Sequence, residues 1–329
     1  MLPIRYLLSA VACALALAPV SAIHAKTQND YPNKPITVVV GFPPGTSVDN
    51  VARILAEQFS KRWKQPVIVD NRAGASGAIG AASVSRANAD GYTLLLSSSG
   101  PMTINPHVRQ NLNYSPLKDF APIGQSALLP YMLVSNPSLP ASTVGDLAAL
   151  AKKDPEKYTY GSIGTGSTSH LIMALLLDAS DIKMTHVPYG GSGQVQTDVI
   201  AGNIDMAFDT VVANMPMVKS GRLKAIAVST PERSPLMPEV PTVAEQGYPD
   251  FSASAWLGFF APANTPDDVV QKISTTLNES LQEPEVAAKL SALGLEVRFS
   301  DTPADFRKMV EDEYGRWSQV VKNIGVKLD

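Results

Sequence analysis

Cysteine is almost missing from this 329-residue sequence, which contains only Cys13. A single cysteine cannot form an intramolecular disulfide, and its position excludes cysteine-ligated zinc and a thiol nucleophile from the body of the chain. Histidines are too few and too scattered for a histidine-rich metal site. The sequence therefore predicts no catalytic residue, no metal and no cofactor. The four histidines are His24, His107, His170 and His186.

Positive charge and long apolar runs are also scarce. Lys and Arg number 27 against 30 Asp and Glu, a formal net charge of −3, so a nucleic-acid partner is not expected. Beyond residue 25 no segment reaches about 18 uninterrupted apolar residues, the length typical of a membrane span. With 45% apolar and 17% charged residues the chain has a globular composition. Its length suits two domains or one large one.

The first 25 residues have the pattern of a secretory signal peptide. Arg5 supplies the positive charge, and residues 7–18 form an apolar run shorter than the roughly 20 residues that a membrane anchor needs. Small residues allow cleavage after Ala22 or after Ala25. The mature protein is then exported, soluble and free of cysteine.

After the signal the sequence alternates short apolar strands with helical stretches. Ile36–Val40 (ITVVV) is typical of a strand buried on both faces, and residues 49–62 carry apolar side chains at helical spacing. The alternation of strands and helices restarts near Tyr131. The proline-rich residues 231–241 indicate a connector. Thr-Pro pairs at 265–266 and 302–303 predict two late helix starts. The pattern predicts two α/β lobes, each with a mostly parallel sheet flanked by helices.

Motifs of common enzyme classes are absent. The sequence has no G-x-S-x-G elbow, no phosphate-binding G-x-x-x-x-G-K loop and no G-x-G-x-x-G after a strand. An exported hydrolase that uses Ser167 or Ser98 with His170 stays an alternative, although no nucleophile motif supports it.

Four loops rich in Gly, Ser and Thr follow predicted strands and precede predicted helices. Ligands of open α/β sheets bind beyond the carboxyl ends of the strands, where helix N-termini present free N–H groups to anions. We therefore expect a binding site that includes Asn71 and Ser98, although each loop alone could be a turn with a cap. His170 can donate to a ligand or pack as a cap, and Arg72 can clamp a carboxylate or brace its loop. The loops cover residues 41–47, 71–77, 97–100 and 161–170.

An ordered set of short motifs resembles the Bug family, the periplasmic solute-binding proteins of tripartite tricarboxylate transporters. The resemblance covers the chain from about Tyr31 to its C-terminus. It rests on the start YPNKPITVVVGFPPG at residue 31, on DNR at 70–72, DGYTL at 90–94, DFAP at 119–122, SHL at 169–171, HVPY at 186–189 and PTVAE at 241–245.

The resemblance implies a type II periplasmic-binding-protein fold with a hinged cleft between the lobes. Lobe 1 is then residues 26–128 plus 252–329, and lobe 2 is residues 129–251. The implied ligand is a small organic carboxylate, aliphatic or aromatic, delivered to integral membrane transporter subunits. Alternatively, the protein serves only as a receptor that signals to a sensor ectodomain. The implied ligand-binding residues are Phe42, Gly45, Thr46, Ser47, Asp49, Gly164, Thr165, Ser167, Thr168, His170 and Asp209.

Four positions depart from the family pattern: Thr46, Val48, Ala73 and Thr210. A side chain at Thr46, where the family usually has glycine, narrows the backbone cradle or replaces a water. These departures concern the identity of the ligand, which the sequence leaves open. We expect a monomer in the periplasm.

Overall fold

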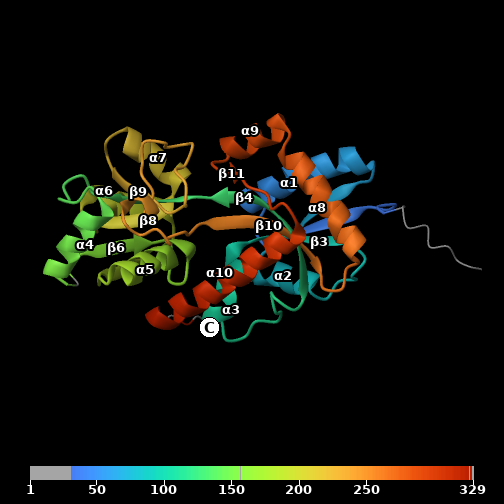
Figure 1. The fold of residues 1–329 in the computed structure, drawn as a ribbon, viewed down its shortest axis with the longest axis horizontal. Coiled ribbons are helices and arrows are strands. Elements are labelled where there is room, and N and C mark those ends of the chain that lie inside the picture. The colour runs from blue at the N-terminus through green and yellow to red at the C-terminus, as the bar shows by residue number, and fades with distance from the viewer. Residues whose placement is uncertain (1–30, 156, 326, 328–329) are drawn as a thin grey trace, which may run out of the picture. The chain divides into compact units, whose positions relative to one another are not determined.

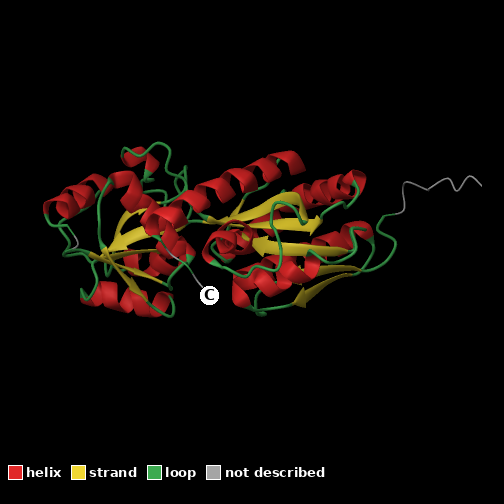
Figure 2. Cartoon of the chain, turned by 90° about the horizontal axis from the view of Figure 1, so that it is seen from below, coloured by secondary structure: helices red, strands yellow, loops and turns green. Residues whose placement is uncertain are grey.

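The computed structural model describes residues 31–155, 157–325 and 327. Residues 32–329 form one compact unit, in which helices pack on both sides of two β-sheets (Figures 1 and 2). The signal peptide expected at residues 1–25 lies outside the described residues. Within the described part of the chain no helix has the length and apolar character needed to cross a membrane.

The first sheet has six strands in the order β11-β4-β10-β3-β1-β2. Strand β1, between β3 and the edge strand β2, is apolar and almost fully buried, as its sequence predicts. The long strands β4 and β10 separate β3 from the two-residue strand β11 at the edge. The strands are β1 (Ile36–Val40), β2 (Val67–Asn71), β3 (Thr93–Ser98), β4 (Phe120–Leu129), β10 (Ala255–Pro262) and β11 (Glu296–Val297).

The second sheet has five strands in the order β7-β6-β8-β5-β9. The proline-rich residues 231–241 follow its last strand and lie outside every helix and strand, as predicted. The strands are β5 (Tyr131–Ser135), β6 (Thr159–Ser162), β7 (Thr185–Pro188), β8 (Met206–Thr210) and β9 (Lys224–Val228).

The prediction of mostly parallel sheets is confirmed in the direction of the strands, although both sheets are mixed: β1–β4 share one direction against β10 and β11, and β6–β9 share one direction against β5. In the first sheet β1 pairs parallel with β2 and β3, whereas the ladders β10–β3, β10–β4 and β11–β4 are antiparallel. In the second sheet β6 pairs parallel with β7 and β8, but β5 is antiparallel to β8 and β9. β5 and β10, which run against the main strand direction of their sheets, each follow a passage of the chain between the sheets instead of a βαβ crossover.

Helices connect the parallel strands and cover the sheets. The expected helix start at Thr302 is confirmed, because Thr302 and Asp305 form a capping box. At the other Thr-Pro pair Pro266 is the cap residue, and the Thr265 hydroxyl donates to the Pro262 carbonyl instead. The helices are α1 (Ser47–Trp63), α2 (Ala78–Val84), α3 (Asn105–Val108), α4 (Val144–Lys153), α5 (Thr168–Ser180), α6 (Ser192–Ala201), α7 (Val211–Lys219), α8 (Asp267–Leu281), α9 (Pro284–Ala292) and α10 (Pro303–Ile324).

The chain passes between the sheets twice, and the two passages are hydrogen-bonded to each other. Only Pro130 separates β4 from β5 on the way out. On the return the Ser229 N–H donates to the Tyr131 carbonyl, and the Ala253 N–H donates to the Ser229 carbonyl, both at 2.9 Å. These bonds place the two passages side by side.

Helix α10 contributes to the hydrophobic cores of both sheets. Phe306 and Val310, near its start, pack in one buried cluster with Trp256 of β10. Trp317 and Val320, further along the same helix, belong to the cluster that contains Phe208 of β8. The two sheets therefore share one long helix as well as the two chain passages (Figure 1).

Two glycine substitutions test this packing in opposite directions. A Cβ at Gly258 would overlap the ring of Phe306 and lie 3.2 Å from the Gly124 carbonyl oxygen, so Gly258→Ala should cost about 1–3 kcal/mol of unfolding free energy. Gly315 is an exposed residue of α10 with open space around it, so Gly315→Ala should stabilise by about 0.5–1 kcal/mol. Urea denaturation of both variants measures the two values. A Gly258→Ala variant with the same free energy of unfolding as wild type would contradict the packing of α10 on β10.

Candidate functional site

The predicted site residues of the first lobe lie at one edge of the first sheet. Strands β2, β1 and β3 are parallel neighbours, so their carboxyl ends share that edge. The loop of residues 41–46 follows β1, Asn71 ends β2 and Ser98 ends β3. The residues at this edge are Phe42, Gly45, Thr46, Ser47, Asp49, Asn71 and Ser98.

Asp49 is the centre of the loop between β1 and α1. Its Oδ2 accepts from the Gly45 N–H at 2.8 Å and from Arg53 Nε at 3.0 Å. Its Oδ1 accepts from Asn71 Nδ2 at 2.9 Å, and the same amide also donates to the Phe42 carbonyl at 3.1 Å. Asp49 is 2% exposed. The carboxylate thus fixes the loop from within.

The charge on Asp49 is stabilised by its partners. Burial would raise the pKa of Asp49, but the hydrogen bonds from Arg53, Gly45 and Asn71 outweigh it and hold that pKa below its ordinary value. Arg53 also donates through Nη2 to Asn71 Oδ1 at 3.1 Å. Arg53 was not among the predicted site residues, although its spacing of four from Asp49 on a helix is the signal that indicates the pair.

Thr46 begins α1. Its hydroxyl accepts from the Asp49 N–H at 3.4 Å and donates to the Pro43 carbonyl at 2.9 Å. A threonine at the cap position therefore satisfies one N–H of the first helical turn. This departure from the family pattern leaves the hydroxyl engaged inside the loop.

The predicted residues of the second lobe gather in the loop between β6 and α5. Ser167 is the cap residue of α5 and accepts from the His170 N–H at 3.4 Å. The Ser169 hydroxyl accepts from the Ile163 N–H at 3.1 Å. Gly164 and Gly166 have φ angles of +131° and +75°, which favour glycine. The site residues in this loop and first turn are Gly164, Thr165, Ser167, Thr168 and His170.

His170 braces this loop with its ring. Its Nδ1 accepts from the Gly166 N–H at 3.0 Å, and the ring stacks on His186 with centroids 3.9 Å apart and planes at 4°. The ring of Tyr160 stacks on the ring of His186, with centroids 4.9 Å apart. Burial and then the neighbouring His186 lower the pKa of His170 to about 4, and burial lowers the pKa of His186. Both imidazoles are therefore neutral at pH 7.

Asp209 lies at the end of β8, next to the end of β6. Its Oδ1 accepts from the Thr210 N–H at 2.7 Å, and within the described chain Oδ2 is buried without a hydrogen-bond partner. Burial raises the pKa of Asp209. Tyr131 pairs in register with Thr210, and burial followed by the charge of Asp209 raises its pKa. Sequence reasoning missed Tyr131, because nothing in its strand marks it as the neighbour of Asp209.

The predicted residues thus form two groups, one on each sheet. Among the hydrogen bonds of the described residues, none joins one group to the other. Arg72 donates to Asp70 at 2.8 Å, so it braces its own loop. The contacts of the hydrolase candidates do not support a catalytic pair. Ser167 Oγ accepts from the His170 N–H as the cap of α5, and His170 Nδ1 accepts from the Gly166 N–H, while Ser98 ends β3 of the other sheet. No group of three or more His, Cys, Asp or Glu among the described residues could hold a metal ion.

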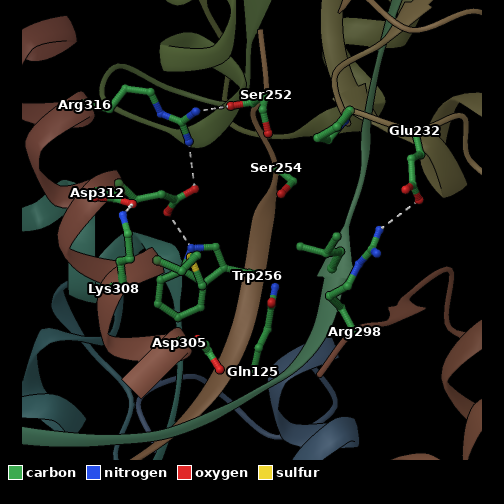
Figure 3. Close-up of a pocket in the computed structure, with 14 residues that line it drawn as sticks. Gln125, Glu232, Ser252, Ser254, Trp256, Arg298, Asp305, Lys308, Asp312 and Arg316 are labelled. Atoms are coloured by element: carbon green, nitrogen blue, oxygen red, sulfur yellow. Dashed lines mark hydrogen bonds and ion pairs between the residues drawn. The ribbon is translucent and has the colours of Figure 1, made fainter. Parts of the chain in front are cut away.

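A cavity of about 610 Å³ lies against α10 and β10 and contains none of the predicted residues (Figure 3). Three ion pairs line the cavity, and a fourth acidic residue, Asp305, caps α10. The pairs are Arg298–Glu232 at 3.6 Å, Lys308–Asp312 at 2.6 Å and Arg316–Glu313 at 3.1 Å.

Known proteins resemble this chain over most of its length. The model of the tripartite tricarboxylate transporter family receptor matches residues 51–326. Protein BugT of Bordetella pertussis is 36% identical over 319 residues, which cover 97% of this chain and 96% of BugT. The structure of Rpa4515 of R. palustris with adipate is 34% identical with a TM-score of 0.73, covering 91% of this chain and 99% of that one. MatC of Rhodopseudomonas palustris with bound malate is 31% identical with a TM-score of 0.69, covering 88% and 100%.

The two-lobed fold and these relatives define a solute-binding protein rather than an enzyme. The chain belongs to the tripartite tricarboxylate transporter receptor family, and the resemblance to the Bug proteins is confirmed.

Asp49→Asn tests the role of the buried carboxylate. Loss of the charge leaves Arg53 and the Gly45 N–H poorly paired, so we expect a loss of about 1–3 kcal/mol of unfolding free energy at pH 7. The folded-state pKa of Asp49 is depressed, so its contribution is present above the ordinary pKa near 4 and is lost as pH falls through the folded value. The difference from wild type should therefore shrink below about pH 4.

Asp70→Asn is the matched control, because Asp70 is 40% exposed in its pair with Arg72. It should change the unfolding free energy by less than about 0.5 kcal/mol. Urea denaturation across pH 3–7 measures both variants. Equal stabilities of Asp49→Asn and wild type at pH 7 would refute the central role of Asp49.

Proposed function

We propose that the chain is a periplasmic protein that captures a small organic carboxylate between its lobes and delivers it to a tripartite tricarboxylate-type membrane transporter. In this proposal lobe 1 is residues 26–128 plus 252–329, lobe 2 is residues 129–251, and the protein acts as a monomer. The observation that carries the proposal is the pair of polar loops, each at the carboxyl edge of a sheet and each leading into a helix N-terminus.

The chemistry of the loops supports an anionic ligand. A helix N-terminus presents unpaired N–H groups and the positive end of the helix dipole, which together favour a carboxylate. Hydrogen bonds to a charged group contribute about 1.5–3 kcal/mol each, so a few of them from Ser47, Thr168 and backbone N–H groups suffice for micromolar affinity. The relatives with adipate and malate bind ligands of this class.

Asp209 supports a ligand that also carries a hydrogen-bond donor. Its Oδ2 is buried and without a partner within the described chain, and the site gains a hydrogen bond if a ligand hydroxyl or a protonated carboxyl donates to that oxygen. Burial raises the pKa of Asp209, and hydrogen bonds lower it in part. We therefore include Asp209 among the ligand-binding residues.

Closure of the lobes follows from the position of the two groups. A ligand that contacts both loops makes all of its contacts only when the lobes are closed, so its binding shifts the population toward the closed form. The closed form then presents a surface that a transporter can distinguish from the empty protein.

A binding assay with matched ligands tests the proposal. The protein without residues 1–25 is titrated with adipate, with malate and with adipamide, in which neutral amides replace the carboxylates. At a hundred times its dissociation constant a ligand should stabilise the fold by about 2.7 kcal/mol, which a thermal melt detects. Adipamide should give no shift. If no aliphatic or aromatic carboxylate in a panel raises the melting temperature of the folded protein, the proposal is overturned.

Two substitutions test whether both lobes contact the ligand. Ser47 and Thr168 are the first helical residues of α1 and α5. Ser47→Ala and Thr168→Val should each weaken binding of the responding carboxylate about tenfold to a hundredfold, the loss of one hydrogen bond to a charged group. Ser220→Ala, at the far end of α7 from the strand edge, is the control and should leave the affinity unchanged. If the variant in one lobe binds the ligand with wild-type affinity, the binding site is limited to the other lobe.

A further inference from the structure

Ser162, the last residue of β6, connects a histidine to the loop of the second lobe. Its hydroxyl lies 2.7 Å from His186 Nε2, 3.0 Å from the Gly164 carbonyl oxygen and 3.2 Å from the Gly164 nitrogen. His186 is on β7, which pairs parallel with β6 and places His186 beside Tyr160 in register. One side chain thus links the neighbouring strand to both backbone groups of Gly164.

The three contacts of Ser162 fix the proton on His186. A hydroxyl offers one donor and two acceptor lone pairs. The Gly164 carbonyl can only accept and the Gly164 N–H can only donate, so the hydroxyl donates to the first and accepts from the second. The remaining lone pair then accepts from His186, and Nε2 of His186 carries the hydrogen.

The same reasoning fixes the proton on His170. Its Nδ1 accepts from the Gly166 N–H, so the hydrogen of the neutral ring is on Nε2. The two rings stack face to face, so His186 supports His170 as well as Ser162. Both histidines border a cavity of about 920 Å³ on lobe 2, where the charges of Lys152 and Lys183 are balanced by those of Asp178 and Asp181.

We infer that His186, acting through Ser162 and through its stack on His170, is a positioning residue for the ligand loop that holds Gly164 and Gly166 in their binding conformation. The inference rests on the proposed function, because the loop is the proposed carboxylate site of lobe 2. His186 does not belong to that loop, and its effect on a ligand is through the backbone groups that it fixes.

The inference predicts a loss of affinity that a matched replacement restores. Ser162→Ala and His186→Leu should each weaken adipate binding about tenfold, the effect of losing one hydrogen bond that orders the site. His186→Gln offers an amide N–H donor at about the place of Nε2 and should bind adipate within about threefold of wild type. Isothermal titration at pH 7 measures the three dissociation constants; malate replaces adipate if only malate binds to wild type.

Val199→Ala separates positioning from simple destabilisation. Val199 of α6 is fully buried in a hydrophobic cluster of the same lobe, so this variant lowers the melting temperature without removing a hydrogen bond of the loop. Its affinity for adipate should match that of wild type. If His186→Leu and Ser162→Ala also bind like wild type, the positioning role is overturned while the proposed function stands. If wild type binds no carboxylate, the proposed function itself fails.

Nitrogen NMR of the imidazoles provides a readout that needs no ligand. Protein labelled with ¹⁵N-histidine should show both rings neutral at pH 7, with the hydrogen on Nε2 in His170 and in His186. Ser162→Ala should change the His186 signals and the backbone amide signal of Gly164. A hydrogen on Nδ1 of His186 would contradict the proposed link to Ser162, whatever the protein binds.

Discussion

The free N–H groups at the start of a helix are the constraint around which this molecule is arranged. Every helix leaves its first N–H groups without an intrahelical partner, and those of α1 and α5 lie at the ends of buried strands. In the first lobe a carboxylate, Asp49, supports the preceding loop from inside. In the second lobe neutral groups, the hydroxyls of Ser162 and Ser167 and the ring of His170, do the same. The first loop is therefore supported by an ion pair and the second by neutral groups, while both have the same place in their lobes.

That difference has a consequence for what each loop can hold. The charge of Asp49 is already matched by Arg53 and by two N–H donors, so the first loop is close to electrically neutral. The second loop contains no ionised side chain, because burial keeps both histidines uncharged. An anion bound between the loops, as proposed, would meet dipoles and hydroxyls rather than a fixed opposite charge.

Much of the fold and part of the site can be predicted from the sequence. The run Ile36–Val40 and the apolar spacing of residues 49–62 indicate a buried strand and a helix, and both are present. Strand β4 could not be predicted, because the buried polar residues Gln125 and Ser126 interrupt its apolar pattern. Without β4 and β10 the sequence does not reveal the antiparallel ladders of the first sheet.

The site contacts that the sequence does not predict also depend on the arrangement of the strands. The loops and their caps follow from local sequence, because a cap and its partner are three residues apart. The contact of Ser162 with His186 spans 24 residues of sequence, and the pairing of Tyr131 with Thr210 joins β5 to β8, which are far apart in the chain. Such contacts depend on which strands become neighbours, and a single sequence does not determine strand order.

The passage at Pro130 sets the way in which the two lobes can move. A single residue between β4 and β5 does not form a flexible linker. The return passage is hydrogen-bonded to the first passage, from the Ser229 N–H to the Tyr131 carbonyl. If the lobes close as proposed, this connection favours small torsions along β4, β10 and α10 over a change concentrated in a flexible linker. A joint of this kind has little disorder to lose when the lobes close, so little of the binding energy is consumed in ordering it.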